Sequence, residues 1–85
     1  MANAMWALRR ARSPAWTQTD LGRLIGKDRR QVSHYELGRY LPNLATAMDI
    51  ATALGATLED IFFEEYKRSM ERVARRIERR DEGSA

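Results

Sequence analysis

The chain of 85 residues carries apolar side chains at helical spacing along most of its length. They recur every three or four positions, and no stretch shows the sustained alternation of a half-buried β-strand. Glycine or proline interrupts the pattern at positions 13–14, 26, 38–43 and 55. We therefore expect an all-α protein whose helices begin and end near these positions.

The first helix is expected over about Asn3–Arg12, because Pro14 cannot continue it. Its predicted apolar face consists of Ala4, Trp6, Ala7, Leu8 and Ala11. This face would pack against the remaining helices.

The second helix has a clear start and end. Thr17 and Asp20 are three residues apart, as in a capping box, and Trp16 and Leu21 hold the positions of a hydrophobic staple. Gly26 is expected to take the left-handed conformation that ends a helix. The helix should therefore end at residue 25.

The third helix follows almost at once. Asp28 and Gln31 repeat the capping-box spacing, and Gly38 closes the helix. The residues predicted to face inward are Val32, Tyr35 and Glu36. The opposite face carries Arg30, Ser33, His34 and Leu37.

Two further helices are expected before residue 63. Asn43 caps a helix over Leu44–Leu54, and Gly55 follows it as the left-handed residue. Thr57 with Asp60 then opens a short helix that contains Leu58, Ile61 and Phe62.

The segment after Phe62 is also predicted to be helical, either continuing the previous helix to about Arg80 or restarting near Phe63. Its apolar residues are spaced as in two heptads, at Phe63, Tyr66, Met70, Val73 and Ile77. This seam predicts a contact with a second copy or with another protein. The alternatives are packing on the chain's own core and binding to a membrane surface.

These elements divide the chain into a domain at residues 1–62, an amphipathic helix at 63–80 and a frayed end at 81–85. The chain has no cysteine and one histidine, which excludes disulfides and the usual structural zinc sites, so we expect no metal and no cofactor. No apolar run is long enough to span a membrane, and the N-terminal segment does not resemble a secretory signal. We expect a soluble cytoplasmic protein.

Positive charge is concentrated in one window. The net charge is only +3, but 13 of the 15 cations are arginine, and residues 23–39 hold five cations against two anions. The guanidinium fork suits phosphates and base edges. By contrast, the sequence contains no cysteine nucleophile, no phosphate-binding glycine loop and no plausible carboxylate pair, so we do not expect an enzyme.

Two short helices joined by a glycine-containing turn, with arginine and histidine on the second, describe a helix-turn-helix. Gly22 falls where the two helices cross and leaves room for their close approach, and Gly26 makes the turn. The chain resembles the lambda repressor/Cro-type helix-turn-helix family, which includes small XRE-like bacterial and phage regulators. The resemblance covers about residues 5–62 and rests on Arg12, TQTDLGRLIG at 17–26, VSHYELG at 32–38, Pro42 and MDIATALGATLEDIF at 48–62.

The resemblance implies a five-helix domain whose third helix enters the major groove of DNA, usually as a dimer on a palindromic operator. It implies base contacts by Arg29, Arg30, Gln31 and His34. It implies a phosphate contact by Gln18, and Arg39 and Asn43 beside the loop are further phosphate candidates. Lys27 stands where the family usually has an apolar residue, but its ammonium group can reach a phosphate. Gln31 and Ser33 can reach either phosphates or bases. Arg12 and Glu36 match a structural pair that joins the first and third helices. Leu37 either touches a thymine methyl group or packs beneath the following loop.

We therefore expect a sequence-specific regulator of transcription that binds double-stranded DNA, acting as a homodimeric repressor at the bacterial nucleoid. The alternative is an antitoxin or accessory module that binds a protein partner, such as a toxin, through its C-terminal helix. The seam at residues 63–77 is the feature on which this alternative depends.

Overall fold

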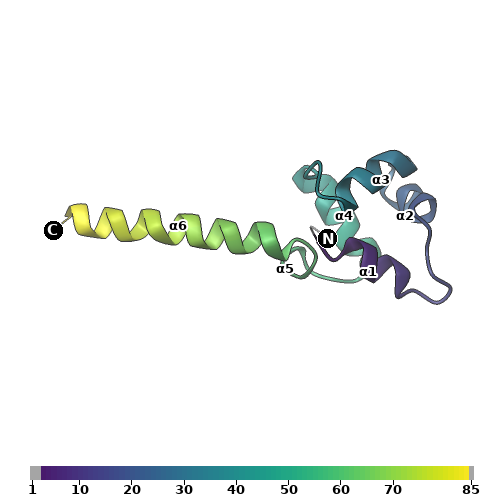
Figure 1. Ribbon diagram of the computed structural model, residues 1–85, viewed down its shortest axis with the longest axis horizontal. Coiled ribbons are helices and arrows are strands. Elements are labelled where there is room, and N and C mark those ends of the chain that lie inside the picture. Colours follow the sequence, from purple (N-terminus) through teal and green to yellow (C-terminus); the bar gives the residue numbers. More distant parts are fainter. Residues whose placement is uncertain (1–2, 85) are drawn as a thin grey trace.

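A computed structural model describes residues 3–84, and this part of the chain is helical and contains no β-strand. Its elements are α1 (Met5–Arg10), α2 (Gln18–Ile25), α3 (Arg29–Glu36), α4 (Leu44–Leu54), α5 (Leu58–Ile61) and α6 (Phe63–Ser84) (Figure 1). The predicted all-α fold is confirmed. None of these helices is long and apolar enough to cross a membrane.

The molecule has two parts of different shape. Helices α1 to α5 pack into a head domain, here residues 3–62, whereas α6 projects from it as a single rod (Figure 1). The longest dimension of the molecule is 57 Å, and the other two are 21 and 20 Å. A new helix begins at Phe63 because Phe62 leaves the helical conformation, with φ −106° and ψ 46°.

α6 is longer than predicted. We expected the helix to end near residue 80 and the last five residues to fray, but it continues through Ser84. Ala85 lies outside the described residues. Opposite charges three or four positions apart stabilise an exposed helix, and Arg68 and Glu65 form such a pair at 2.9 Å. No proline stops the helix before its end.

The capping boxes of α2 and α3 are both present, as predicted. Asp20 N donates to Thr17 Oγ1 at 3.0 Å, and Thr17 N donates to Asp20 Oδ2 at 2.8 Å. Gln31 N donates to Asp28 Oδ1 at 2.8 Å, and Asp28 N donates to Gln31 Oε1 at 3.3 Å. Because these bonds are local, the start of each helix is fixed by four consecutive residues.

Glycines set the geometry of the turn between α2 and α3. Gly26 ends α2 in the left-handed region, with φ 69°. A Cβ atom at Gly22 would collide with the backbone oxygen of Lys27, so a larger residue could be accommodated only if the turn moved. The steric roles predicted for Gly22 and Gly26 are therefore confirmed.

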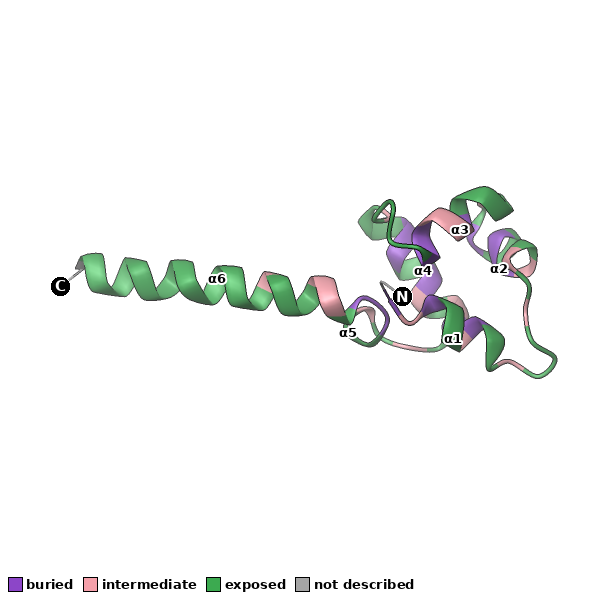
Figure 2. Cartoon of the chain, in the orientation of Figure 1, coloured by how far each residue is buried: buried purple, intermediate pink, exposed green. Residues whose placement is uncertain are grey.

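The core lies where α1 to α5 meet, in the region coloured as buried in Figure 2. Its fully buried side chains are Met5, Leu21, Val32, Ile50 and Ile61. The predicted inward face of α3 is confirmed, since Val32, Tyr35 and Glu36 are all buried.

The predicted apolar face of α1 is wrong. The helix buries Met5 and Arg9 and packs Leu8 partly on the core, whereas Trp6, Ala7 and Ala11 are exposed and Ala4 is half-buried. Met5, Leu8 and Arg9 follow the spacing of one helical face. Apolar residues alone could not identify this face, because one of its positions is filled by a charged side chain. The helix is also shorter than the predicted Asn3–Arg12.

Candidate nucleic-acid interface

The outer surface of α3 carries exposed arginine side chains. Arg29, Arg30 and Gln31 are exposed at its N-terminal end, opposite the buried side. Within the described part of the chain, neither arginine forms an ion pair. Both guanidinium groups are therefore available to an anionic ligand.

Further polar groups lie at the two ends of α3. Lys27 is half-buried in the turn before it, and Ser33 is half-buried on the helix itself. Arg39 is exposed in the loop that follows. Asn43 is exposed and caps α4, with its Oδ1 accepting from Thr46 N at 2.9 Å. The capping bond uses only the Asn43 oxygen and leaves its side-chain nitrogen available as a donor. In Gln31, likewise, the oxygen closes the capping box and the side-chain nitrogen is available.

A concave surface adjoins the N-terminal end of α2. Arg10, Gln18, Thr19 and Arg29 contribute to its lining, and its volume is about 540 Å³. The first amide groups of a helix lack partners within the helix and carry partial positive charge. Arg10 is exposed, with its guanidinium 5.0 Å from the centre of the Trp6 ring. Sequence reasoning missed Arg10, since only its position beside α2 distinguishes it from other surface arginines.

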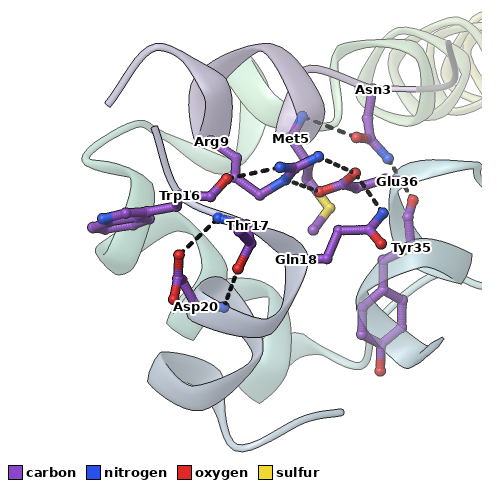
Figure 3. Close-up of polar contacts among 9 residues, drawn as sticks. All are labelled: Asn3, Met5, Arg9, Trp16, Thr17, Gln18, Asp20, Tyr35 and Glu36. Carbon is purple, nitrogen blue, oxygen red and sulfur yellow. Dashed lines mark hydrogen bonds and ion pairs between the residues drawn. The ribbon is translucent and has the colours of Figure 1, made fainter. Parts of the chain in front are cut away.

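A buried ion pair joins α1 to α3, but its arginine is not the predicted one. Arg9 donates from Nε to Glu36 Oε2 at 2.7 Å and from Nη2 to Oε1 at 3.1 Å (Figure 3). A third bond runs from Arg9 Nη1 to the carbonyl oxygen of Trp16 at 2.8 Å. Both side chains are almost fully buried. The expected pairing of Arg12 with Glu36 is thus wrong.

Arg12 has a different structural role. Its Nη2 donates to the carbonyl oxygen of Ala53 at 2.6 Å, which joins the end of α1 to α4. Its guanidinium also lies over the Trp16 ring, 4.4 Å from the ring centre. Arg9 points to Glu36 because it shares the inward face with Met5, whereas Arg12 lies beyond the end of the helix.

Gln18 belongs to the same polar network. Its Nε2 donates to Glu36 Oε1 at 3.1 Å, and the side chain is half-buried (Figure 3). The amide nitrogen carries two N–H groups, so the bond to Glu36 uses one donor and leaves the other free. Gln18 can therefore keep its bond to Glu36 and still offer one N–H group at the start of α2, where it lines the concave surface.

Asn3 also holds the position of α3, and the sequence reading did not single it out. Its Oδ1 accepts from Met5 N at 3.0 Å, and its Nδ2 donates to the carbonyl oxygen of Tyr35 at 2.8 Å (Figure 3). The only sequence signal was an asparagine at the start of the predicted first helix.

His34 and Leu37 complete the outer face. The His34 ring lies 4.8 Å from the Tyr40 ring, and its Nδ1 is buried without a hydrogen-bond partner among the described residues. Leu37 is 58% exposed, so the expectation that it packs beneath the loop is wrong. It lines a largely apolar groove of about 510 Å³ with Trp6 and Ser33. The described residues include no cluster of three or more histidines or carboxylates able to hold a metal.

Comparison with known proteins places these features in a family. The family model described as Helix-turn-helix matches residues 8–61. An uncharacterised HTH-type transcriptional regulator of Methanocaldococcus jannaschii is 41% identical over 49 residues, which cover 58% of this chain and 74% of the relative. An uncharacterised HTH-type transcriptional regulator of Bacillus subtilis is 36% identical over 48 residues, covering 56% and 73%.

Proposed function

The chain belongs to the lambda repressor/Cro-type helix-turn-helix family, and from this membership we propose that it binds double-stranded DNA by sequence and regulates transcription. The finer proposal is a homodimeric repressor that occupies a palindromic operator in the cytoplasm. The observation that carries the proposal is the cationic outer face of α3, held in position by a buried opposite face.

Base recognition is assigned to α3. The N-terminal end of this helix carries Arg29 and Arg30, whose guanidinium groups can donate to both O6 and N7 of a guanine. The side-chain nitrogen of Gln31 remains available as a donor. The edge of the His34 ring that lies away from the buried Nδ1 remains available for a base contact. The capping box and the Glu36 network fix how α3 is presented, so little freedom is lost when it enters the groove.

Phosphate contacts are assigned to the groups around α3. Lys27 and Arg39 lie before and after it in the chain, and Ser33 and Asn43 add uncharged donors. At the start of α2, backbone amides and Arg10 supply a second contact region, and Gln18 can join it through its second amide N–H while its first stays on Glu36. Such contacts fix register on the duplex without reading sequence.

The homodimer proposal is supported by the seam on α6. All five of its residues are exposed, so the alternative that they pack on the chain's own core is wrong. A two-fold symmetric dimer would match a palindrome, with half-site centres roughly 10 to 10.5 bp apart or a multiple of this. Repression would follow from occupancy alone. The second candidate is that a different protein, such as a toxin, binds the seam. The exposure of the five seam residues favours this candidate as well.

Selection of bound sites from a random duplex library tests the proposal, followed by measurements with Arg30→Ala. We expect this variant to lose about 1 to 3 kcal/mol on the selected site and to relax the preference at one base pair. Arg75→Ala removes the same charge from an exposed position on α6 and is the matched control. If Arg30→Ala lost the same binding free energy on selected and on random DNA, Arg30 would contact a phosphate rather than a base.

A further inference from the structure

The seam on α6 has no cover within the described chain. Its five residues are between 43% and 55% exposed, and every residue from 71 to 83 is exposed. The rod leaves the head domain at Phe63 and does not fold back (Figure 2). The whole apolar stripe is therefore presented along one side of the helix.

We propose that a second copy of the chain covers this seam in parallel orientation, which places both head domains at the same end of a two-stranded coil. The inference rests on the proposed homodimer and specifies its geometry. In a parallel pair each seam residue meets its own counterpart. All five apolar layers, from Phe63 to Ile77, then form at once.

An antiparallel pair fits the seam less well. In an antiparallel coil, a residue at the first core position of the heptad (a) lies opposite a residue at the second core position (d) of the partner. The register that pairs Met70 with Val73 and Tyr66 with Ile77 also places Phe63 opposite Arg80. This register keeps four apolar layers and sets an aromatic ring against a guanidinium group at each end, whereas the parallel coil keeps five and places Arg80 beside its own counterpart only beyond Ile77. Sliding the helices to avoid this contact removes apolar layers from the centre.

Charged residues beside the seam favour the same orientation. With Phe63 in the first core position, Arg76 and Asp81 flank the core on opposite sides, five residues apart. These positions face each other across a parallel coil, which gives two symmetric ion pairs. In the antiparallel register above, Arg76 would face Ser69. Within the described chain neither Arg76 nor Asp81 forms an ion pair.

Parallel pairing has a direct consequence for DNA binding. The coil would begin one residue after the last core residue, Phe62, so both head domains would lie beside its start. Both α3 helices could then address one duplex.

Disulfide trapping distinguishes the two orientations, and the absence of native cysteine keeps the background low. Tyr66→Cys and Ile77→Cys are made separately in the full chain and oxidised alone and as a mixture. In the parallel coil each variant forms a covalent dimer alone. In the antiparallel register identical positions are about 16 Å apart along the axis, too far for a disulfide, and only the mixture forms one. Glu78→Cys places the thiol away from the seam, so the covalent dimer that it forms measures cross-linking by random collision.

A charge exchange provides a second test that leaves the apolar seam intact. Mixing Arg76→Asp with Asp81→Arg should favour the mixed dimer over either homodimer by about tenfold, because both ion pairs are restored only in the mixture. Mixing Arg75→Asp with Asp81→Arg involves the same charges but should show no preference, since Arg75 points away from the seam in the parallel coil.

Covalent dimers from each single-cysteine variant, with preference for the mixed dimer in the charge exchange, would support the inference. Cross-linking only in the Tyr66→Cys and Ile77→Cys mixture would overturn it, as would a wild-type chain that sediments as a monomer. These failures differ from failure of DNA binding. A chain that binds a selected site as a monomer would keep the DNA-binding proposal and lose the parallel coil.

Discussion

The head domain and α6 show the same kind of amphipathic pattern but use it differently. In the head domain the apolar faces of α2, α3 and α4 cover one another and bury Leu21, Val32 and Ile50 completely. On α6, Phe63 and Ile77 have the same helical spacing and remain in solvent. Helical periodicity therefore predicts that an apolar face exists, but it does not identify what will cover that face.

The two regions differ most at the buried ion pair, which lies in the head domain. Glu36→Ala should destabilise the head domain by about 3 to 5 kcal/mol, because Arg9 would stay buried without its counter-charge. Thermal unfolding monitored by the combined fluorescence of Trp6 and Trp16 measures this loss. Arg12→Ala removes an arginine outside the pair and should cost less, about 1 to 2 kcal/mol. Equal losses would contradict the assignment of Arg9.

The glycines of the two regions should respond in opposite directions. Gly22→Ala should destabilise the head domain by about 1 to 3 kcal/mol, since its Cβ meets the Lys27 carbonyl in a packed turn. Gly83→Ala in α6 has free space around it and should raise helix content slightly. Chemical unfolding gives the first quantity and circular dichroism the second. A stable Gly22→Ala variant would show that the turn can move without cost.

Acid should weaken the cap at the start of α2 in the head domain. Hydrogen bonds from the Thr17 backbone, and then from its side chain, lower the pKa of Asp20. The folded pKa thus lies below the unfolded one, so the cap stabilises the head domain above the unfolded value and loses this effect as pH falls through the folded value. The stability difference between wild type and Asp20→Asn should narrow below about pH 4. A constant difference down to pH 2 would contradict this.

Met70→Glu should have the smallest effect on the head domain and a large one on assembly. A charge in the middle of the seam opposes pairing, but Met70 has no contact with the core. We expect an unchanged unfolding temperature of the head domain and loss of the dimer in sedimentation. Glu71→Lys, beside it on the outer face, changes charge without touching the seam and controls for net charge. A dimer that survives Met70→Glu would place the interface elsewhere.

The features that the sequence predicted well are local. α2 and α4 have their predicted bounds, because Thr17, Asn43 and the left-handed glycines act within one turn of each helix end. The face of α1 was predicted wrongly because Arg9 fills a buried position, and its partner Glu36 lies 27 residues away. Arg9 and Arg12 carry the same charge three residues apart. Only the packed positions of Glu36 and Ala53 distinguish their partners.

In the candidate site, too, local features were predicted well and contacts between distant segments were not. Helical spacing was enough to place Arg30 on the outer side of α3, the family resemblance added Arg29, and the structure leaves both exposed. It did not reveal that Gln18 is bound to Glu36 or that Arg10 borders the start of α2. Those relations join segments that are distant in sequence, so they depend on tertiary packing rather than on local pattern.

The central claim is that the head domain reads DNA and that α6 pairs two such heads. Site selection from a random duplex library, run in parallel with the wild-type chain and with Met70→Glu, tests it most directly. We expect a palindrome for the wild type, and for the variant one half of the same palindrome with weaker binding. An unstructured set of sites from the wild type, or an unchanged palindrome bound equally well by Met70→Glu, would contradict it.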